Sequence, residues 1–156
     1  MPVLTHDEAI AWAARQRANG RRIVFTNGCF DLLHPGHVRY LAAARSHGDA
    51  LIVAVNSDRS VHAIKGPTRP VNTDRDRAEV LAALAAVDAV VIFDEDDPHA
   101  IVAALQPDVL VKGADWAADR IVGRDVVEAR GGTVIRVAVA PGFSTTGMIE
   151  KIRSRS

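Results

Sequence analysis

The sequence is short of cysteine, of net charge and of long apolar runs. Its one cysteine among 156 residues allows no intramolecular disulfide and no cysteine-based zinc cluster. Lysine plus arginine and aspartate plus glutamate number 19 each, so the formal net charge is zero. A neutral chain gives no electrostatic support to binding of nucleic acid or of a membrane surface, and we expect neither partner.

The lack of long apolar runs bears on where the protein works. No stretch is long enough to span a bilayer, and residues 1–12 lack the basic region and apolar segment of a secretion signal. We therefore expect a cytoplasmic protein. Hydrophobic residues make up 48% and charged residues 24%, as in a typical globular protein, and the length predicts a single domain over residues 1–156.

Patterns typical of strands and of helices alternate along the chain. Short apolar runs rich in β-branched residues predict five strands, at residues 22–28, 50–58, 89–93, 108–113 and 133–140. Capping residues, prolines and amphipathic spacing predict helices at residues 5–18, 35–47, 74–86, 97–105 and 144–153. Residues 57–73 are expected to be mostly loop. The alternation predicts a single-domain α/β fold, with a Rossmann-like, doubly wound, parallel five-stranded sheet flanked by helices.

Polar clusters follow four of the predicted strands. They occupy residues 26–31, 56–58, 112–116 and 142–146. In a doubly wound sheet, ligands bind outside the carboxyl ends of the strands, where the strand order reverses. The clusters therefore predict a ligand site at that edge of the sheet.

Two of the six histidines flank Pro35 and Gly36, where a strand gives way to a helix. With Pro35 as the first helical residue, His34 lies at the N-cap and His37 in the first turn, so both rings share one face. Free backbone N–H groups and the helix dipole favour an anion there, and Gly36 lets a ligand oxygen approach the backbone. The pattern favours a polyphosphate site over an ordinary helix start with two exposed histidines.

Other interpretations of this segment are weaker. A zinc site at His34 and His37 lacks a third and a fourth ligand with obvious spacing. A nucleophilic Cys29 needs a paired base, so a small residue packed in a tight turn is the better interpretation of it. The chain also contains no Walker A sequence and no G-x-G-x-x-G motif.

The segment GCFDLLHPGH, residues 28–37, resembles the H-x-G-H signature of the nucleotidyltransferase superfamily. Three further stretches narrow the resemblance to the D-glycero-β-D-manno-heptose 1-phosphate adenylyltransferases: Asn56–Arg77, Leu110–Trp116 and Ser144–Thr146. The resemblance covers nearly the whole chain from Arg21 onward, and KGPTRPVN, residues 65–72, is the part that points to heptose. In many bacteria this activity is fused behind a sugar kinase domain, and the length of this chain predicts the stand-alone form.

The resemblance implies a reaction between ATP and a sugar 1-phosphate, which gives ADP-heptose and pyrophosphate. A phosphate oxygen of the sugar attacks the α-phosphorus in line, and it is already ionised at pH 7, so no general base or covalent intermediate is required. Catalysis then rests on positioning and charge stabilisation. Mg²⁺ is expected with the nucleotide, held largely by phosphates and water. A homodimer or higher homo-oligomer and a role in lipopolysaccharide or a related glycan are implied as well.

The resemblance also assigns roles to individual residues. It implies catalytic roles for His34, His37 and Lys65. It implies nucleotide-binding roles for Thr26, Asn27, Gly28, Cys29, Phe30, Gly36, Arg77, Lys112, Gly113, Asp115, Trp116, Ser144, Thr145 and Thr146. Substrate contacts are expected from Asp31 and Asn56. A Mg²⁺ ligand and a carboxylate that fixes a loop are alternatives for Asp31, and the other metal ligands stay open.

Some of these assignments have a physical argument beside them. Arg77 is a cation in the first turn of a helix, where it opposes the dipole, and this favours a ligand-binding role. Ser144 to Thr146 open the last helix, so their hydroxyl and N–H groups suit phosphates, although ordinary N-capping is the alternative. Lys65 as a solvated loop lysine, Asp115 as a turn residue and Trp116 as a core residue are open alternatives too.

The family usually has Gly-Gly-Asp-Tyr where this chain has Gly113-Ala114-Asp115-Trp116, which leaves the selectivity for base and sugar open. Rival functions within the superfamily are the glycerol-3-phosphate cytidylyltransferases and the pantetheine-phosphate and flavin adenylyltransferases. A non-catalytic nucleotide-binding module is a rival of a different class. The basic residues Lys65, Arg77 and Lys112 argue against that module.

Overall fold

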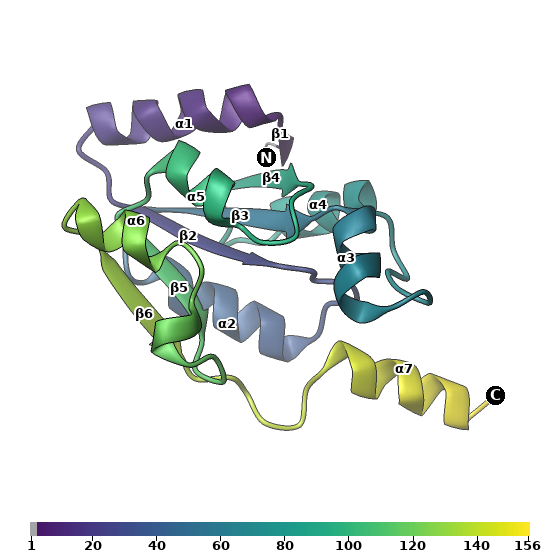
Figure 1. Cartoon of the computed structure of the whole chain (residues 1–156). Helices are drawn as coiled ribbons and strands as arrows, with labels where there is room; N and C mark the ends of the chain where they lie inside the picture. Colours follow the sequence, from purple (N-terminus) through teal and green to yellow (C-terminus); the bar gives the residue numbers. More distant parts are fainter. Residues whose placement is uncertain (1–2) are drawn as a thin grey trace.

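The computed structural model describes residues 3–156 and contains one β-sheet with helices on both faces (Figure 1). The sheet is built from six strands: β1 (Val3–Leu4), β2 (Ile23–Gly28), β3 (Ala50–Asn56), β4 (Ala89–Phe93), β5 (Val109–Gly113) and β6 (Thr133–Val137). They lie in the order β1-β4-β3-β2-β5-β6 and pair in parallel. The predicted fold class is confirmed, with one strand more than expected, because β1 pairs with the edge of β4.

The helices cover the sheet in two groups. They are α1 (His6–Ala18), α2 (Pro35–Arg45), α3 (Asp58–Lys65), α4 (Asp74–Ala82), α5 (His99–Leu105), α6 (Arg124–Ala129) and α7 (Thr145–Ser154), with a short 3₁₀ turn, η1 (Ala118–Arg120). Buried side chains of α1, α5 and α6 pack on one face, and those of α2 and α4 pack on the other. None of the helices within residues 3–156 is long and apolar enough to cross a membrane.

Alternating side chains of the central strands feed the two cores. Phe25 of β2 and Ile52 of β3 belong to the core under α1 and α5, whereas Val24 and Val53 belong to the core under α2 and α4. All four are fully buried. The continuous apolar runs of β2 and β3 are thus explained by burial on both faces, as is usual for strands of a parallel sheet.

Residues at the helix starts explain where α1, α2 and α7 begin. Thr5 and Glu8 form the capping box that their spacing predicts. Pro35 is the first residue of α2. The hydroxyl of Ser144 accepts a hydrogen bond from the N–H of Gly147 and starts α7.

The structure corrects the expectations at several elements. Residues 58–65 form α3 instead of loop, capped by the Ser57 hydroxyl, which accepts from the N–H of Ser60. Helix α4 ends at Ala82 and not near residue 86, and β6 ends at Val137 instead of residue 140. Neither η1 nor α6 was predicted.

The order of the strands creates a reversal in the middle of the sheet. From β2 the chain proceeds through β3 to β4, and it then returns to the other side of β2 to form β5 and β6. The carboxyl ends of β2 and β5 therefore lie next to each other while their following segments run to opposite sides. Such a reversal leaves a crevice above the sheet, where ligands bind in folds of this type.

Candidate functional site

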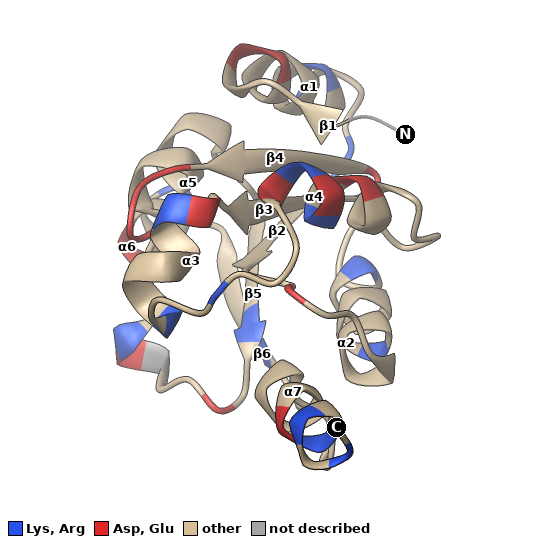
Figure 2. Cartoon of the chain, turned by 90° about the vertical axis from the view of Figure 1, so that its right-hand side faces the viewer, with Lys and Arg blue, Asp and Glu red and all other residues tan. Residues whose placement is uncertain are grey.

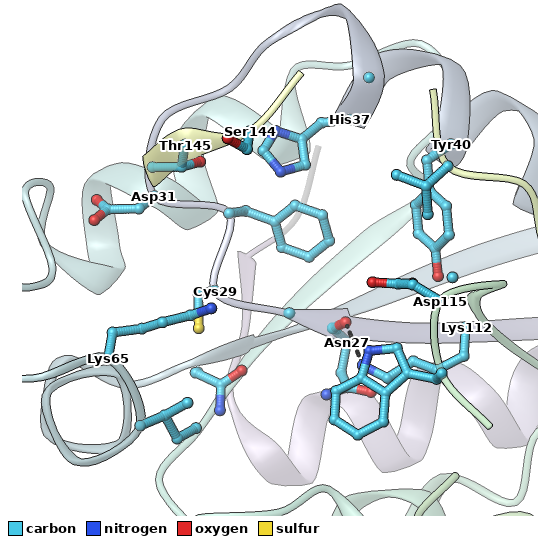
Figure 3. Close-up of a pocket in the computed structure, with 18 of the residues that line it drawn as sticks. Asn27, Cys29, Asp31, His37, Tyr40, Lys65, Lys112, Asp115, Ser144 and Thr145 are labelled. Carbon is cyan, nitrogen blue, oxygen red and sulfur yellow. Dashed lines mark hydrogen bonds between the residues drawn. The ribbon is translucent and has the colours of Figure 1, made fainter. Parts of the chain in front are cut away.

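A cavity of about 500 Å³ opens at the carboxyl ends of β2, β3 and β5. Its walls come from the β2–α2 loop and the start of α2, from the end of α3, from the turn after β5 and from the segment between β6 and α7 (Figure 3). Segments far apart in the sequence thus converge at the strand-order reversal.

Most of the predicted site residues line this cavity. They are Asn27, Gly28, Cys29, Phe30, Asp31, His34, Gly36, His37, Asn56, Lys65, Lys112, Gly113, Asp115, Trp116, Ser144, Thr145 and Thr146. Thr26 and Arg77 lie outside this lining, and both are buried within the protein.

His34 and His37 stack on each other at the start of α2. Their ring centroids lie 3.8 Å apart and their planes differ by 23°. Burial lowers the pKa of His34, and burial together with the neighbouring His34 lowers the pKa of His37 to about 4. Both imidazoles are therefore neutral near pH 7, and each carries a single N–H donor.

The ring nitrogens of this pair have different surroundings. Nδ1 of His34 and Nδ1 of His37 are buried and have no hydrogen-bond partner within the part of the chain that the structure describes. Nε2 of each ring is not enclosed in this way. Because the cavity touches both residues, Nε2 is the nitrogen of each ring that a ligand can reach.

Two phenylalanine rings pack against the histidine pair. Phe30 meets His37 edge to face at 5.3 Å and 61°, and Phe143 stacks on His34 at 5.8 Å and 15°. A Cβ atom at Gly36 would come within 2.9 Å of the His34 ring and 3.1 Å of the Cβ of Phe143. Glycine is thus required at this position for ring packing, in addition to any approach of a ligand to the backbone.

Asp31 fixes the loop that follows α3. Its fully buried carboxylate accepts hydrogen bonds from the backbone N–H groups of Val71 and Asn72, at 2.8 and 2.9 Å, and from Nε of Arg69 at 2.8 Å. Burial alone would raise the pKa of Asp31, but the hydrogen bonds from Asn72, Val71 and Arg69 bring it below its ordinary value. Of the roles that the sequence left open for Asp31, these contacts support the fixing of a loop.

Arg77 has a different position from the one expected of a nucleotide-binding residue. The residue is 2% exposed, and its guanidinium donates to the carbonyl oxygens of Cys29, Asn56 and Asn72, at 2.8, 2.8 and 3.0 Å. It also forms an ion pair with Asp58 at 2.8 Å. Its donors are directed at the protein, so Arg77 joins the segments that form the cavity wall instead of facing the cavity.

Thr26 also contacts the protein instead of the cavity. Its hydroxyl lies 2.9 Å from the carbonyl oxygen of Val111 and 2.8 Å from the hydroxyl of Tyr40. The residue is fully buried in β2. Thr26 therefore ties β2 to β5 and α2 beneath the site.

Two lysines extend toward the floor of the cavity. Lys65, the last residue of α3, points toward Cys29 (Figure 3). Nζ of Lys112 lies 3.4 Å from the carbonyl oxygen of Asn27 and 5.0 Å from the ring centroid of Trp116. Burial lowers the pKa of Lys112. Trp116 is 47% exposed, so its ring is a wall of the cavity and not a core residue.

Cys29 lies between these lysines and the start of α2. Burial raises the pKa of its thiol, although nearby cations oppose the effect. A raised pKa keeps the thiol protonated near pH 7, and a thiol is a poor nucleophile compared with a thiolate. The position supports a packing role for Cys29 instead of a covalent one.

The cavity also includes residues that the sequence did not single out. They are Tyr40, Ile64, Arg69, Asp96, Asp97, Pro98, Val122, Val139 and Phe143. Arg69 lies within the stretch KGPTRPVN, and Phe143 directly precedes the stretch STT. Their neighbours in the sequence could therefore have indicated that both residues lie at the site. The segment 96–98 and Val122 reach the cavity only through the folding of distant loops, and the sequence carries no local sign of it.

Comparison with known proteins identifies the family of the chain. A family model described as cytidylyltransferase-like matches residues 25–154, which include the whole cavity lining. The chain belongs to the cytidylyltransferase-like family. The chain is similar to the bifunctional protein HldE of Hyphomonas neptunium, with 54% identity over 96% of this chain, and to that of Rhodopseudomonas palustris, with 56% identity over 90%.

The chain spans about a third of the length of these two relatives, 31% and 29%. Among solved structures, the lipopolysaccharide core biosynthesis protein of Thermoplasma volcanium is 30% identical, with a TM-score of 0.64 over 78% of this chain and 98% of that one. Pantothenate synthetase of Thermus thermophilus also has a TM-score of 0.64, over 99% of this chain and 70% of that one. At 17% identity it shows the shared fold alone.

The described residues do not form a metal site of their own. Within residues 3–156 no group of three or more histidine, cysteine, aspartate or glutamate side chains is arranged to hold a metal ion. The carboxylate of Asp31 is already engaged by Arg69, Val71 and Asn72. Mg²⁺ that arrives with a nucleotide would find its ligands among phosphate oxygens and water.

Proposed function

We propose that the protein transfers the adenylyl group of ATP to D-glycero-D-manno-heptose 1-phosphate, which gives ADP-heptose and pyrophosphate. Membership of the cytidylyltransferase-like family supports the transfer of a nucleotidyl group. Identity above 50% to proteins named HldE, together with the stretch KGPTRPVN, supports heptose as the sugar. The resemblance to adenylyltransferases supports ATP as the donor.

The observation that carries the proposal is the stacked pair of neutral histidines at the start of α2. Each ring has its Nδ1 buried, so Nε2 is the atom that can hold the N–H donor toward the cavity. The free backbone N–H groups of the first helical turn add to this donor set. The arrangement suits the phosphate oxygens on which negative charge accumulates as pyrophosphate departs.

The chemical step needs no covalent intermediate on the protein. A phosphate oxygen of the heptose 1-phosphate forms a bond to the α-phosphorus of ATP while the bond to the bridging oxygen of pyrophosphate breaks. His34 and His37 stabilise the leaving group, and Lys65 and Lys112 supply positive charge at the floor of the cavity. The N–H groups at the start of α7 and the hydroxyl groups of Ser144 and Thr146 hold the outer phosphates, whereas the Thr145 hydroxyl donates to the carbonyl oxygen of Leu32.

The wall opposite the histidines provides a place for the base. The exposed indole ring of Trp116 and the turn after β5 line the cavity, and a Cβ atom at Gly113 would clash with the Asp115 carboxylate. An adenine ring packs well on such a flat surface. In this assignment the sugar phosphate occupies the side of the cavity near Asn56 and Lys65.

Release of pyrophosphate tests the proposal directly. ATP, CTP and GTP are each incubated with D-glycero-D-manno-heptose 1-phosphate of either anomer, and with glycerol 3-phosphate and pantetheine phosphate as rival acceptors. The proposal expects pyrophosphate and ADP-heptose from ATP and one heptose anomer. Faster turnover of CTP with glycerol 3-phosphate would instead identify a cytidylyltransferase. Binding of ATP without release of pyrophosphate, over the whole panel, would identify a nucleotide-binding module.

A further inference from the structure

We propose that Phe143 is a positioning residue for His34: its ring holds the imidazole at the cavity and thereby couples the β6–α7 segment to the start of α2. The effect on turnover rests on the proposed function, whereas the ring packing itself does not. Phe143 stands directly before the N-cap of α7, and His34 is the N-cap of α2.

The ring of His34 lacks the hydrogen bond that usually holds a functional histidine in one orientation. A functional histidine is normally held by a hydrogen bond to the ring nitrogen that does not face the ligand. For both His34 and His37 that nitrogen, Nδ1, is buried without a partner within residues 3–156. Without this bond, packing is what can hold the two rings in place.

The packing forms a continuous stack. Phe143 lies nearly parallel to His34, His34 lies nearly parallel to His37, and the edge of Phe30 closes the far end. The contacts of Phe143 with His34 at 5.8 Å and of Phe30 with His37 at 5.3 Å lie within the favourable range for packing of such rings. Of the four rings, only that of Phe143 comes from the β6–α7 segment, so the stack is where this segment meets α2.

Two further contacts tie the same segment to the same end of α2. The guanidinium of Arg39, one turn into α2, lies 5.4 Å from the ring centroid of Phe143. The hydroxyl of Thr145 donates to the carbonyl oxygen of Leu32 at 3.0 Å. Beyond its first turn α7 stands away from the body (Figures 1 and 2), and none of its described residues is buried.

These contacts give Phe143 a role that apolar bulk alone cannot fill. Because α7 buries no side chain, its phosphate-facing first turn depends on the contacts of residues 143–145 for its place beside the histidines. Loss of the ring would free the His34 imidazole to rotate and to meet water. Misplacement of a donor by a small distance is enough to reduce the rate substantially.

The first measurement follows the imidazole of His34 by ¹H–¹³C NMR in the whole protein without substrate, with its resonances assigned from His34→Gln. Phe143→Leu keeps apolar bulk and removes the ring, whereas Phe143→Tyr keeps the ring. In Phe143→Leu we expect the His34 ring resonances to lose the ring-current shift and the titration midpoint of His34 to rise toward 6.5, its ordinary value. Phe143→Tyr should resemble the wild type.

The second measurement is kinetic. With ATP and heptose 1-phosphate, Phe143→Leu should lower kcat by ~10-fold, and Phe143→Tyr should restore it to within ~3-fold of the wild type. Val38→Ala, on an exposed position of α2 outside the cavity, is the control and should leave kcat unchanged.

Two results would overturn the proposal. One is unchanged resonances and titration of His34 in Phe143→Leu, which would show that the stack does not hold the ring. The other is a changed titration with kcat and KM both unchanged, which would show that the ring position does not matter to turnover. Absence of any nucleotidyl transfer by the wild-type protein would refute the proposed function. The NMR result would still show whether the ring of Phe143 holds that of His34.

Discussion

The proposed role of the histidine pair predicts a loss of activity when either ring is removed. We expect His34→Ala and His37→Ala each to lower kcat/KM by ~10²–10³, the usual effect of losing one preorganised donor. Their rings face the cavity and not the main cores, so circular dichroism and thermal unfolding should show a folded protein. Turnover close to the wild type in either variant, at any concentration of ATP, would remove that histidine from the mechanism.

The depressed pKa of His37 also predicts a pH dependence of stability. The folded protein resists protonation of this ring down to about pH 4, whereas the unfolded chain binds the proton near 6.5. Stability is therefore lost as the pH falls through this window, because the unfolded state binds more protons there. His37→Gln should flatten the fall in the free energy of unfolding between pH 7 and 4.5, as measured by urea titration.

A matched variant makes this pH measurement specific. His47→Gln removes a histidine from an exposed position just after α2. If it flattens the pH dependence as much as His37→Gln does, the burial of His37 is not the cause.

Residue types and their spacing were enough to predict most of the residues named for the cavity, but not the contacts that these residues make. The H-P-G-H pattern placed both histidines on one helix face, which the stacked rings confirm. The contacts of Arg77 were not predictable, because two of its carbonyl partners lie at Cys29 and Asn56, 48 and 21 positions away in the chain. A cation in the first turn of a helix looks the same in the sequence whether it faces a ligand or the backbone of the protein.

At the scale of elements, Arg77 joins the carboxyl ends of β2 and β3 to the loop before α4. Arg77→Met would leave the buried carbonyl oxygens of Cys29 and Asn56 without a donor. Such loss of a buried donor costs about 1–3 kcal/mol per group, so we expect a loss of at least ~2 kcal/mol in the free energy of unfolding. Urea titration followed by circular dichroism measures this change.

Arg59→Met is the control for the loss of an arginine. Arg59 lies on α3 with 55% of its side chain exposed and pairs with Asp94 and Asp96. Exposed ion pairs contribute less than ~1 kcal/mol. Equal destabilisation by the two substitutions would contradict the structural role of Arg77.

The elements themselves were predictable where the pattern was long. The strands of the central sheet were found from their apolar runs, and α1, α2 and α7 from capping residues and Pro35. The missed strand β1 has only two residues, too few for any periodic pattern. Helix α3 was taken for loop because its eight residues are mostly polar, with only Ser60 and Val61 buried.

For the whole molecule, the alternation of strands and helices was enough to predict a parallel, doubly wound sheet and a site at its carboxyl edge. The order in which the strands pair cannot be predicted from any single segment. The strand-order reversal between β2 and β5 is therefore seen only in the folded chain. Positively and negatively charged residues are interspersed, as Figure 2 shows for α4, where Lys or Arg residues lie next to Asp or Glu residues. Self-association stays a prediction, which sedimentation equilibrium measures.

The rate of pyrophosphate release with heptose 1-phosphate tests most directly the proposal that the protein transfers the adenylyl group of ATP. Discrimination between bases can be large, because a wrong base leaves buried polar groups unpaired. We expect kcat/KM for ATP to exceed that for CTP and for GTP by at least ~10-fold, which corresponds to about 1.4 kcal/mol in the transition state. Equal or faster turnover of CTP or GTP would contradict the adenylyl assignment, and no turnover of any nucleotide would contradict the account as a whole.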